Sequence, residues 1–367
     1  MTRVAHISSV HQRNDTRIYL KQCSSLAAAG YDVYLIVADG QGDAEIGDVK
    51  ILDIGLPKGR LQRMLISPGR LLKRALQIKA TIYHLHDPEL IPIGLRLRSA
   101  GKHVVFDSHE DVPQQLLSKP YLGPLSRRVL SSVFSVFERF TCRKFDAIVA
   151  ATPFIRDKFL KINPRTVNIN NYPMQGELSA ESDEGEARTK VCYIGGIEAI
   201  RGAREIIRAM ESVRSGTRLE LAGSFSDSAL RAEIRQYEGW GQVDECGVVD
   251  RAGVRAILGR SLAGLVTFLS APNHIDAQPN KMFEYMSAGV PVIASHFPLW
   301  REIVEGNACG VCVDPSQPHE IAAAIDFFAE NPDQVKIMGA NGRRAVLDRY
   351  NWAMEEAKLL NLYESLS

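Results

Sequence analysis

The sequence predicts an α/β protein made of two doubly wound domains in tandem. Three observations support this: the length of 367 residues, the alternation of short apolar runs with helical patterns in both halves, and a polar, acidic stretch between the halves. A single hydrophobic core stops growing near about 250–300 residues, so this length favours two domains. Apolar residues make up 45% and charged residues 24%, which excludes a collagenous or largely disordered protein.

In the first half, apolar runs of strand length alternate with helical patterns. Asp15–Ala29 has helical periodicity and is followed by Gly30, a residue suited to the position after a helix. Such alternation is typical of parallel sheets that are covered by helices on both faces. The predicted strands are Arg3–Ile7, Asp32–Val37, Val49–Ile54, Thr81–Leu85, His103–Asp107, Asp146–Ala150 and Thr166–Ile169.

The second half repeats this alternation. Its predicted strands are Lys190–Ile194, Arg218–Ala222, Val243–Cys246, Gly264–Phe268, Pro291–Ala294 and Val311–Asp314. Its predicted helices are Arg201–Val213, Ala229–Glu238, Asn280–Ala288, Glu320–Ala329 and Asp333–Leu347. In open sheets of this kind ligands bind beyond the carboxyl ends of the strands, so functional residues are expected directly after strands.

A polar segment and the distribution of charge set the predicted domain boundaries. Residues 174–187 are mostly polar and acidic, which is typical of a surface linker. We therefore predict a first domain over residues 1–173, a second over 188–345, and a C-terminal helix over 346–367. Residues 1–175 carry 25 Lys and Arg against 15 Asp and Glu, whereas the remainder carries 19 against 28. The basic half could meet an anionic membrane, a phosphorylated acceptor or nucleic acid.

What the sequence lacks excludes several classes of protein. It has no apolar run close to the about 20 residues of a membrane-spanning helix, and no signal-peptide core near its start. Six scattered cysteines favour a reduced, cytoplasmic setting. No G-x-G-x-x-G follows the first strand and no histidine or cysteine cluster has zinc spacing, so neither a cofactor nor a metal is expected. No nucleic acid is expected either, because no aromatic interleaving or known module is present.

The strongest candidate site lies in Asp276–Gly289, whose sequence is DAQPNKMFEYMSAG. The pattern predicts a helix whose first turn would present unpaired backbone N–H groups and a lysine charge, which suits an anion such as a diphosphate. Glu284, one turn further, would repel phosphate and suits the hydroxyl groups of a ribose or a sugar. The alternative is an amphipathic helix with an ordinary capped start. The residues at the predicted diphosphate site are Ala277, Gln278, Pro279, Asn280 and Lys281.

This segment resembles the acidic-x7-acidic motif of the retaining, metal-independent glycosyltransferases of family four. In that family the first acid is usually Glu, whereas Asp276 stands here; Glu284 matches the second acid in type and spacing. The resemblance implies that Asp276 holds hydroxyl groups of a donor sugar and that Glu284 anchors a ribose. The absence of an Asp-x-Asp triplet disfavours the metal-dependent class of glycosyltransferase.

A second segment, Val191–Gly202 (VCYIGGIEAIRG), resembles the loop that opens the second domain in the same family. Members typically carry an Arg directly after the first glycine and a Lys before the last. Here Gly196 follows Gly195, and Arg201 takes the place of the lysine, so one diphosphate-binding charge is missing and the other is substituted. Arg201 can still make bidentate contacts with phosphate. A solvent-facing arginine at a helix start is the alternative. Leu219–Gly223 and Gly247–Arg251 resemble the two strand-end loops that border the nucleotide base in this family, where a turn glycine that only packs is equally consistent.

In the first half, two predicted strands end in loops rich in histidine and acids, Tyr83–Leu90 (YHLHDPEL) and Val104–Asp111 (VVFDSHED). Strand ends seldom collect so many ionisable groups without a reason. His109 matches the position of a family histidine that touches the donor sugar, so the resemblance implies a catalytic role for it. His86 and Asp87 could bind the acceptor or form a satisfied structural pair.

The predicted first strand–helix loop is Ser8–Arg17 (SSVHQRNDTR). Many family members have a Gly-Gly pair here, which this sequence lacks. Arg13, Asn14 and Arg17 could reach a diphosphate or an anionic acceptor. The alternative is that both arginines are ordinary surface residues.

Residues 56–80 contain seven Lys and Arg and no acidic residue. Leu71, Leu72, Ala75 and Leu76 would give this segment one apolar face. A basic amphipathic segment fits reversible docking on an anionic membrane surface. The alternative is a solvated helix that packs this apolar face on the core.

The resemblance covers nearly the whole chain and implies the GT-B fold, with two Rossmann-like domains facing a cleft and a C-terminal helix that crosses back to the first domain. It implies a retaining, metal-independent transfer of a sugar from a nucleotide diphosphate sugar to a glycan or lipid-linked acceptor, as in polysaccharide synthesis. Two alternatives remain open. One is a nucleotide-sugar epimerase on the same fold, and the other is a non-catalytic partner that binds a nucleotide sugar for an assembly complex.

Overall fold

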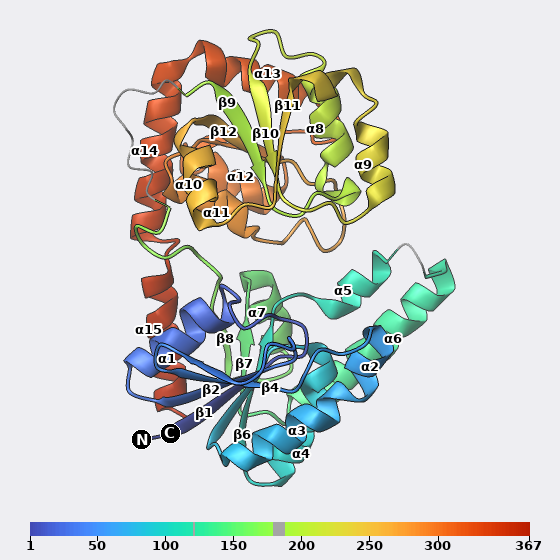
Figure 1. The fold of residues 1–367 in the computed structure, drawn as a ribbon, viewed down its shortest axis with the longest axis vertical. Helices are drawn as coiled ribbons and strands as arrows, with labels where there is room; N and C mark the ends of the chain where they lie inside the picture. Colours follow the sequence, from blue (N-terminus) through green and yellow to red (C-terminus); the bar gives the residue numbers. More distant parts are fainter. Residues whose placement is uncertain (120–121, 179–187) are drawn as a thin grey trace. The chain divides into compact units, whose positions relative to one another are not determined.

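The computed structural model of the chain describes residues 1–119, 122–178 and 188–367. It divides into two compact units: unit 1 comprises Met1–Asn171 and Trp352–Ser367, and unit 2 comprises Tyr172–Asn351. Most of the predicted linker, residues 179–187, lies outside the described residues. Each unit is an α/β structure of the doubly wound type (Figure 1), as the alternating sequence pattern predicts.

Unit 1 contains an eight-stranded sheet with the order β3-β4-β2-β1-β5-β6-β7-β8. All neighbours are parallel except β3 and β4, which pair antiparallel. The carboxyl ends of β1, β5 and β6 are therefore adjacent. The strands are β1 Arg3–Ile7, β2 Asp32–Val37, β3 Ala44–Ile46, β4 Val49–Asp53, β5 Ile82–Leu85, β6 His103–Ser108, β7 Ala147–Ala150 and β8 Thr166–Asn168.

Two buried clusters of side chains, one on each face, hold the helices of unit 1 to its sheet. One cluster includes residues of α3, α4 and α7, and the other includes residues of α1 and the C-terminal helix α15. The helical elements are η1 Ile18–Cys23, α1 Ser24–Ala28, α2 Arg60–Leu65, α3 Ser67–Ile78, η2 Pro88–Leu90, α4 Ile91–Ser99, α5 Val112–Leu117, α6 Pro124–Cys142, α7 Pro153–Leu160 and α15 Trp352–Glu364.

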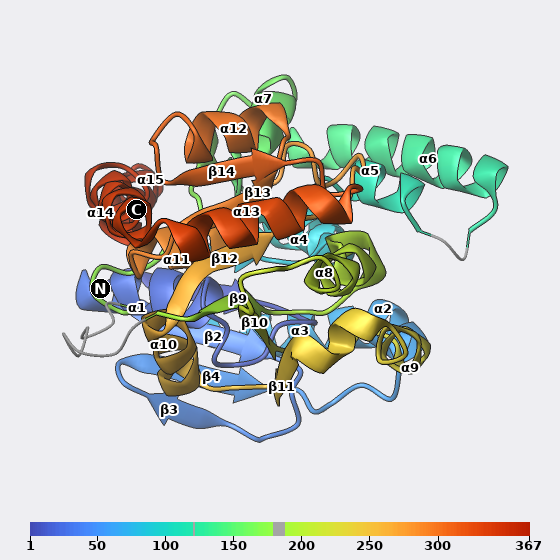
Figure 2. The same cartoon turned by 90° about the horizontal axis from the view of Figure 1, so that it is seen from above.

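Unit 2 contains a six-stranded parallel sheet with the order β11-β10-β9-β12-β13-β14. Its two core clusters again lie on opposite faces, one with α8, α9 and α13 and the other with α10, α11, α12 and α14 (Figures 1 and 2). The strands are β9 Lys190–Ile194, β10 Arg218–Ala222, β11 Val243–Gly247, β12 Ser261–Val266, β13 Val292–Ser295 and β14 Gly310–Val313. The helical elements are η3 Ala199–Arg201, α8 Ala203–Met210, α9 Ser228–Ile234, η4 Glu238–Gln242, α10 Arg251–Gly259, α11 Asn280–Ser287, α12 Pro298–Val304, α13 Pro318–Glu330 and α14 Pro332–Asp348.

The C-terminal helix returns to unit 1, as the resemblance implies. It begins later than residue 346, because α14 continues to Asp348 and α15 starts at Trp352. The indole Nε1 of Trp352 donates to Ser25 Oγ at 3.0 Å, and the phenol oxygen of Tyr363 lies 2.7 Å from His84 Nδ1. The helix therefore anchors to the core of unit 1 at both of its ends.

The basic segment over residues 56–80 is divided between the core and the surface. Leu71 and Ala75 of α3 are fully buried in the core of unit 1, whereas Leu72 is half-buried and Leu76 is exposed, so only part of the predicted apolar face packs against the sheet. Arg63 pairs with Glu89, and Arg74 pairs with Asp43 from a neighbouring loop. No helix in the described residues combines the length and apolar character needed to span a bilayer.

Candidate active site

In unit 2, the start of α11 presents backbone amides at the carboxyl end of the sheet. Pro279 occupies the N-cap position, with extended backbone angles. The N–H groups of Gln278, Asn280 and Lys281 have no hydrogen-bond acceptor in the described part of the chain. Because the helix dipole adds positive potential here, these amides suit an anion, as the sequence pattern predicts.

Ala277 departs from the prediction that its amide is unpaired. Its N–H donates to His274 C=O at 3.1 Å, and its carbonyl accepts a hydrogen bond from Trp300 Nε1 at 2.7 Å. The Gln278 side chain is also engaged, because its Oε1 accepts from the Tyr172 hydroxyl at 3.0 Å. These bonds hold the loop before α11 in place. The backbone N–H groups of Gln278, Asn280 and Lys281 remain unpaired at the start of the helix in the described part of the chain.

Lys281 is the most unusual residue of this site. Its side chain is buried, and its Nζ has no hydrogen-bond partner in the described residues. The ammonium group lies 3.5 Å from the centroid of the Tyr193 ring. Burial, and then the nearby charge of Arg201, lower the pKa of Lys281 well below its ordinary value. An unpaired buried ammonium group is costly, so this residue is a candidate for binding an anion.

The loop after β9 brings a second cation to the same place. A Cβ atom on Gly195 would lie 3.4 Å from Lys281 Nζ, and one on Gly196 would lie 3.2 Å from Arg201 Nη1. Arg201 stacks over Phe268 with its guanidinium 5.5 Å from the ring centroid, and Lys281 Nζ lies 5.4 Å from the same ring. The predicted donor-binding residues of the two loops therefore converge within unit 2.

Gly223, at the end of β10, is required by packing. It has a φ of +144°, and a Cβ atom there would lie 1.9 Å from the carbonyl oxygen of Gly195. Only glycine allows the two loops to approach so closely. For this residue the structure supports the packing role that the sequence left open.

Glu284 has an ionic partner in Arg251, a pairing that the sequence did not predict. Its Oε1 accepts a hydrogen bond from Arg251 Nη1 at 2.8 Å, and Arg251 Nη2 lies 2.5 Å from Glu177 Oε1. Arg251 begins α10, whose N-cap Asp250 accepts from Gly253 N–H at 2.8 Å. Arg251 therefore orients Glu284 and offsets part of the negative charge near the anion site. Asp276 is half-buried and has no hydrogen-bond or ionic partner in the described residues.

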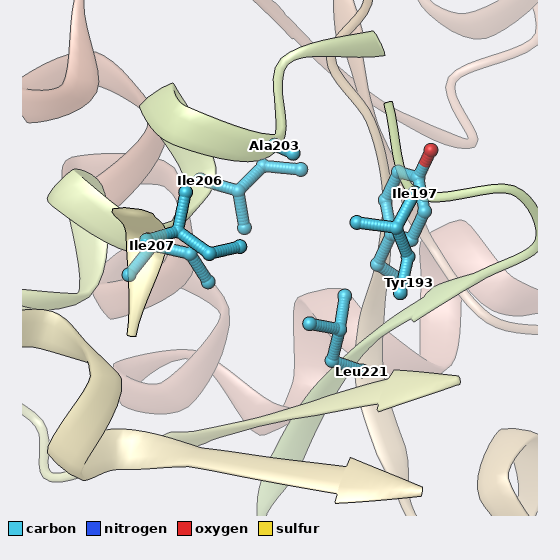
Figure 3. A pocket seen from close by; sticks show the side chains of 7 residues that line it. Tyr193, Ile197, Ala203, Ile206, Ile207 and Leu221 are labelled. Atoms are coloured by element: carbon cyan, nitrogen blue, oxygen red, sulfur yellow. The ribbon is translucent and has the colours of Figure 1, made fainter. Parts of the chain in front are cut away.

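A closed apolar space lies behind this site, between β9, β10 and α8. Figure 3 shows its lining side chains, with the aromatic ring of Tyr193 at one side and its hydroxyl group pointing away from the others. The space does not admit a water-sized sphere, and the Tyr193 hydroxyl donates to Gly196 C=O at 2.8 Å. It is packed core that supports the ring facing Lys281, and it is not a ligand pocket.

In unit 1, Arg13 and Arg17, for which the sequence left phosphate binding or an ordinary surface position open, are both buried in ion pairs and are not surface residues. Arg17 donates from Nη2 and Nε to the carboxylate of Asp107, at 2.7 and 3.0 Å. Arg13 donates to both carboxylate oxygens of Asp39, each at 2.7 Å. Their guanidinium groups are used in holding the loop after β1 to the strands beside it. Asn14 of the same loop remains exposed.

His86 belongs to a buried network of histidines. Its Nε2 lies 2.9 Å from His6 Nδ1, and the Tyr363 hydroxyl joins the network 3.2 Å from His6 Nε2 and 2.7 Å from His84 Nδ1. Burial lowers the pKa of His86 to about 3 and also lowers the pKa values of His6 and His84. His86 is thus a neutral core residue, which agrees with the structural alternative.

Asp107 connects this network to the surface through His109. Its Oδ2 lies 3.3 Å from His109 Nε2 and 3.4 Å from His86 Nδ1, and it also accepts from Gln22 Nε2 at 2.8 Å. The imidazole of His109 is partly exposed, and its centroid lies 5.0 Å from that of His11. His109 is therefore the member of this group that a ligand can reach.

Asp87 fixes the loop after β1. Its Oδ2 accepts hydrogen bonds from Ser9 N–H at 2.6 Å and from the hydroxyl of Ser8 at 2.9 Å. His11 lies close to it, with Nε2 3.7 Å from Asp87 Oδ1. Burial opposes the charged form of His11, but its hydrogen bond with Asp15 and the nearby carboxylates together raise its pKa. Asp87 therefore has a structural role, and the carboxylates around His11 favour the charged form of this neighbour of His109.

Two groups in unit 1 have the chemistry to hold a metal ion. They are His6, His84 and His86, and His86, Asp107 and His109, and in each group the ligand atoms lie within 4.8 Å of one another. The sequence analysis missed these groups, because they join residues of three strands that are far apart in the chain. The available signals were the two strand-end loops rich in histidine and acids, and the spacing of two between His84 and His86, which favours the same face of a strand. In the structure, His6 Nδ1 and His86 Nε2 lie at hydrogen-bond distance from each other, and the Tyr363 hydroxyl engages His84 Nδ1, whereas His84 Nε2 has no hydrogen-bond partner in the described residues.

A pocket of about 360 Å³ in unit 1 lies elsewhere, between α5, α6 and α7. Its Lys158 is engaged by Asp111 at 3.0 Å and by Glu138 at 2.5 Å. None of the residues predicted from the sequence lines this pocket. It does not contribute to the candidate site.

Comparison with known proteins gives two matching family models. Residues 16–170 match the glycosyl transferase 4-like domain, and residues 174–345 match the glycosyl transferases group 1. An uncharacterized glycosyltransferase from Methanocaldococcus jannaschii is 22% identical over 58% of this chain and 54% of its own length. A D-inositol 3-phosphate glycosyltransferase from Xylanimonas cellulosilytica is 25% identical over 47% and 41%. The chain spans about half, or less, of the length of these curated relatives.

Solved structures share the fold over the full chain. Sucrose-phosphate synthase from Thermosynechococcus elongatus has a TM-score of 0.80 at 17% identity and covers 100% of this chain and 99% of its own. The Anabaena protein HepE in complex with UDP-glucose has a TM-score of 0.72 at 12% identity, with both chains fully covered. The two family models and the shared architecture of two parallel-sheet domains show that this chain belongs to the glycosyltransferases of the GT-B fold.

Proposed function

We propose that the chain transfers a sugar from a nucleotide diphosphate sugar to a glycan or lipid-linked acceptor, with retention at the sugar carbon and without a metal ion. The observation that carries this proposal is Lys281, whose buried ammonium group lacks a hydrogen-bond partner beside Arg201 and the free amides of α11 in the described part of the chain. A diphosphate there would satisfy the ammonium and the amides together. This arrangement supplies the charge stabilisation that a departing diphosphate requires.

The remaining roles are parts of the same proposal. Glu284, held by Arg251, binds the ribose hydroxyls, and Asp276 and His109 bind hydroxyls of the donor sugar. Two structures with the same fold support a nucleotide diphosphate as ligand, because HepE contains UDP-glucose and starch synthase IV from Arabidopsis thaliana contains ADP and acarbose. We further propose a role in polysaccharide synthesis in the cytoplasm, with basic residues of 56–80 near an anionic membrane.

Glu284→Ala is expected to lower kcat/KM for sugar transfer by at least about tenfold, which corresponds to about 1.4 kcal/mol of transition-state stabilisation. The fold should persist, because Arg251 keeps Glu177 as a partner when Glu284 is removed. The measurement is release of nucleoside diphosphate from a panel of UDP- and GDP-sugars, with and without a glycan or lipid acceptor.

Glu284→Gln and Glu302→Ala serve as controls for this experiment. The side-chain amide introduced by Glu284→Gln can still bind a hydroxyl group and should retain part of the activity, whereas Glu302 is exposed on α12 and its replacement should be neutral. Normal turnover by Glu284→Ala would remove Glu284 from the site. A wild-type protein that binds a donor yet never releases its nucleotide would contradict catalysis by this chain.

Treatment with EDTA is expected to leave sugar transfer unchanged. The two cations and the helix amides already offset the charge of the leaving diphosphate, so no divalent ion is needed for that step. The measurement compares initial rates after chelation and dialysis with rates in added Mg²⁺ or Mn²⁺. A strict requirement for either ion would contradict the proposed metal independence and leave the assignment as a transferase intact.

A further inference from the structure

Helix α6 presents an apolar stripe to solvent. Five of its six exposed large apolar side chains recur at intervals of four, four, three and four residues, which places them along one face of the helix, and the sixth, Leu130, lies beside this face. The five are Leu125, Val129, Val133, Val136 and Phe140, with 76%, 51%, 62%, 69% and 51% of their surface exposed. A regular apolar stripe that faces water on a folded domain marks an interaction surface.

The opposite face of α6 accounts for its attachment to unit 1. Ser131 Oγ donates to Pro113 C=O at 2.9 Å, and Phe134 packs against the core cluster of unit 1. Figures 1 and 2 both show α6 and its neighbour α5 reaching beyond the sheet of their unit. The stripe is therefore not the side by which the helix packs on its own domain.

Cations accompany this stripe. Arg128 and Arg139 are exposed on α6, and Arg143 and Lys144 follow at its end. The Arg143 guanidinium lies 4.9 Å and Lys144 Nζ 4.1 Å from the centroid of the Phe140 ring. Long cationic side chains around an exposed aromatic ring are typical of helices at the headgroup boundary of a bilayer.

The acidic side chain of α6 does not offset these cations at the surface. Glu138 is buried, and its Oε2 lies 2.5 Å from Lys158 Nζ on α7. A second copy of the chain would fit this surface poorly, because pairing two stripes would bring like-charged arginines together. The charge of the face instead complements anionic lipid headgroups.

We propose that α6 is a membrane-docking helix that inserts the stripe Leu125–Phe140 into the headgroup region of an anionic bilayer. This inference is separate from the proposed sugar transfer and from the basic segment over residues 56–80. It assigns the apolar part of membrane binding to an element that the sequence analysis did not consider. Electrostatic attraction would bring the helix to the surface, and burial of the stripe would hold it there.

The test is flotation of the full chain with vesicles of phosphatidylcholine containing about 30% phosphatidylglycerol, compared with pure phosphatidylcholine. The wild type should float with the anionic vesicles, and binding should weaken as salt shortens the Debye length. Val133→Asp/Val136→Asp should weaken vesicle binding by at least about tenfold, because two charges enter the inserting face. The matched control, Ile337→Asp/Leu347→Asp on the exposed side of α14, should bind like the wild type.

A reporter variant makes the test specific to α6. Phe140→Trp should show a blue shift of its fluorescence with anionic vesicles and quenching by brominated lipid tails. Circular dichroism establishes that the stripe variant is folded, independently of the donor site. Equal flotation of the wild type and Val133→Asp/Val136→Asp would overturn the proposal. The proposal would also be overturned if the wild type did not bind vesicles and sedimented as a dimer without lipid, while Val133→Asp/Val136→Asp sedimented as a monomer.

Discussion

Lys281→Met is expected to stabilise unit 2 and, at the same time, to abolish the stabilisation that a nucleoside diphosphate gives to the wild type. Methionine has nearly the length of the lysine stem and fills the same buried space beside Tyr193 without a charge. Replacing buried ion pairs by apolar side chains of similar volume is often neutral or stabilising by about 1–4 kcal/mol, and Lys281 lacks the compensating hydrogen bonds of such a pair. The wild type should gain about 2.7 kcal/mol from a ligand at 100 times its Kd, and the variant should gain almost nothing.

The dependence on pH follows from the lowered pKa of Lys281. In the unfolded chain its pKa is about 10.5, whereas burial and then Arg201 lower the pKa in the folded state. The unfolded chain therefore binds more protons between these two pKa values, and stability rises with pH across that window. The advantage of Lys281→Met over the wild type should accordingly be largest near pH 7 and shrink as the pH approaches 10.

Thermal denaturation with and without UDP or GDP measures both effects. Calorimetric titration in two buffers with different ionisation enthalpies adds a direct check. A diphosphate stabilises the charged ammonium, so its binding to the wild type should take up protons at alkaline pH, and Lys281→Met should lose this uptake. Lys336→Met, on an exposed face of α14, is the matched control. Full nucleotide binding by Lys281→Met would exclude the proposed diphosphate site.

Much of the fold could be predicted because its signals are local. Strands β1, β2, β9 and β10 have the predicted bounds, since apolar runs between turn residues define them. Two errors have physical causes. The strand β12 begins three residues before Gly264, the residue at which the prediction placed its start. This glycine lies inside the strand because the Tyr285 ring fills the space that a Cβ atom would need, which leaves no room for a larger residue. The predicted helix over Asp15–Ala29 begins only at Ile18, because the Asp15 carboxylate accepts the N–H groups of Arg17 and Ile18.

The candidate site was predictable only where its signal lies within one segment. Pro279 and Gly289 within one short segment predict the helix start of α11, and the spacing of Asp276 and Glu284 carries the resemblance to the family. The burial of the Lys281 side chain could not be predicted, because a lysine on a helix is usually exposed to solvent. The same limit applies to Arg13 and Arg17, whose partners Asp39 and Asp107 lie 26 and 90 residues away along the chain. Long-range ion pairs of this kind depend on strand order, which a local pattern does not encode.

Unit 1 is expected to lose stability steeply as the pH falls below 6.5, owing to its histidine network. His6, His84 and His86 are fully buried, and burial keeps their pKa values below the ordinary value, with that of His86 at about 3. Between pH 6.5 and these lower pKa values the unfolded chain binds more protons than the folded chain, so the free energy of unfolding decreases as the pH is lowered through that window. Each histidine that stays neutral in the folded state lowers the free energy of unfolding at pH 5 by about 2 kcal/mol relative to pH 7.5.

His84→Gln should reduce this acid sensitivity by about 2 kcal/mol at pH 5, because one proton-binding site of the unfolded chain is removed while an amide can still bond the Tyr363 hydroxyl. Urea denaturation at pH 7.5 and 5.0, followed by hydrogen exchange in β5 and β6, isolates unit 1 from unit 2. The exposed His319 of unit 2 provides the matched control, and His319→Gln should leave the loss unchanged. Equal acid sensitivity of the wild type, His84→Gln and His319→Gln would contradict this prediction. It would mean that the buried histidines take up protons in the folded state, where the carboxylate of Asp107 is the nearest opposite charge.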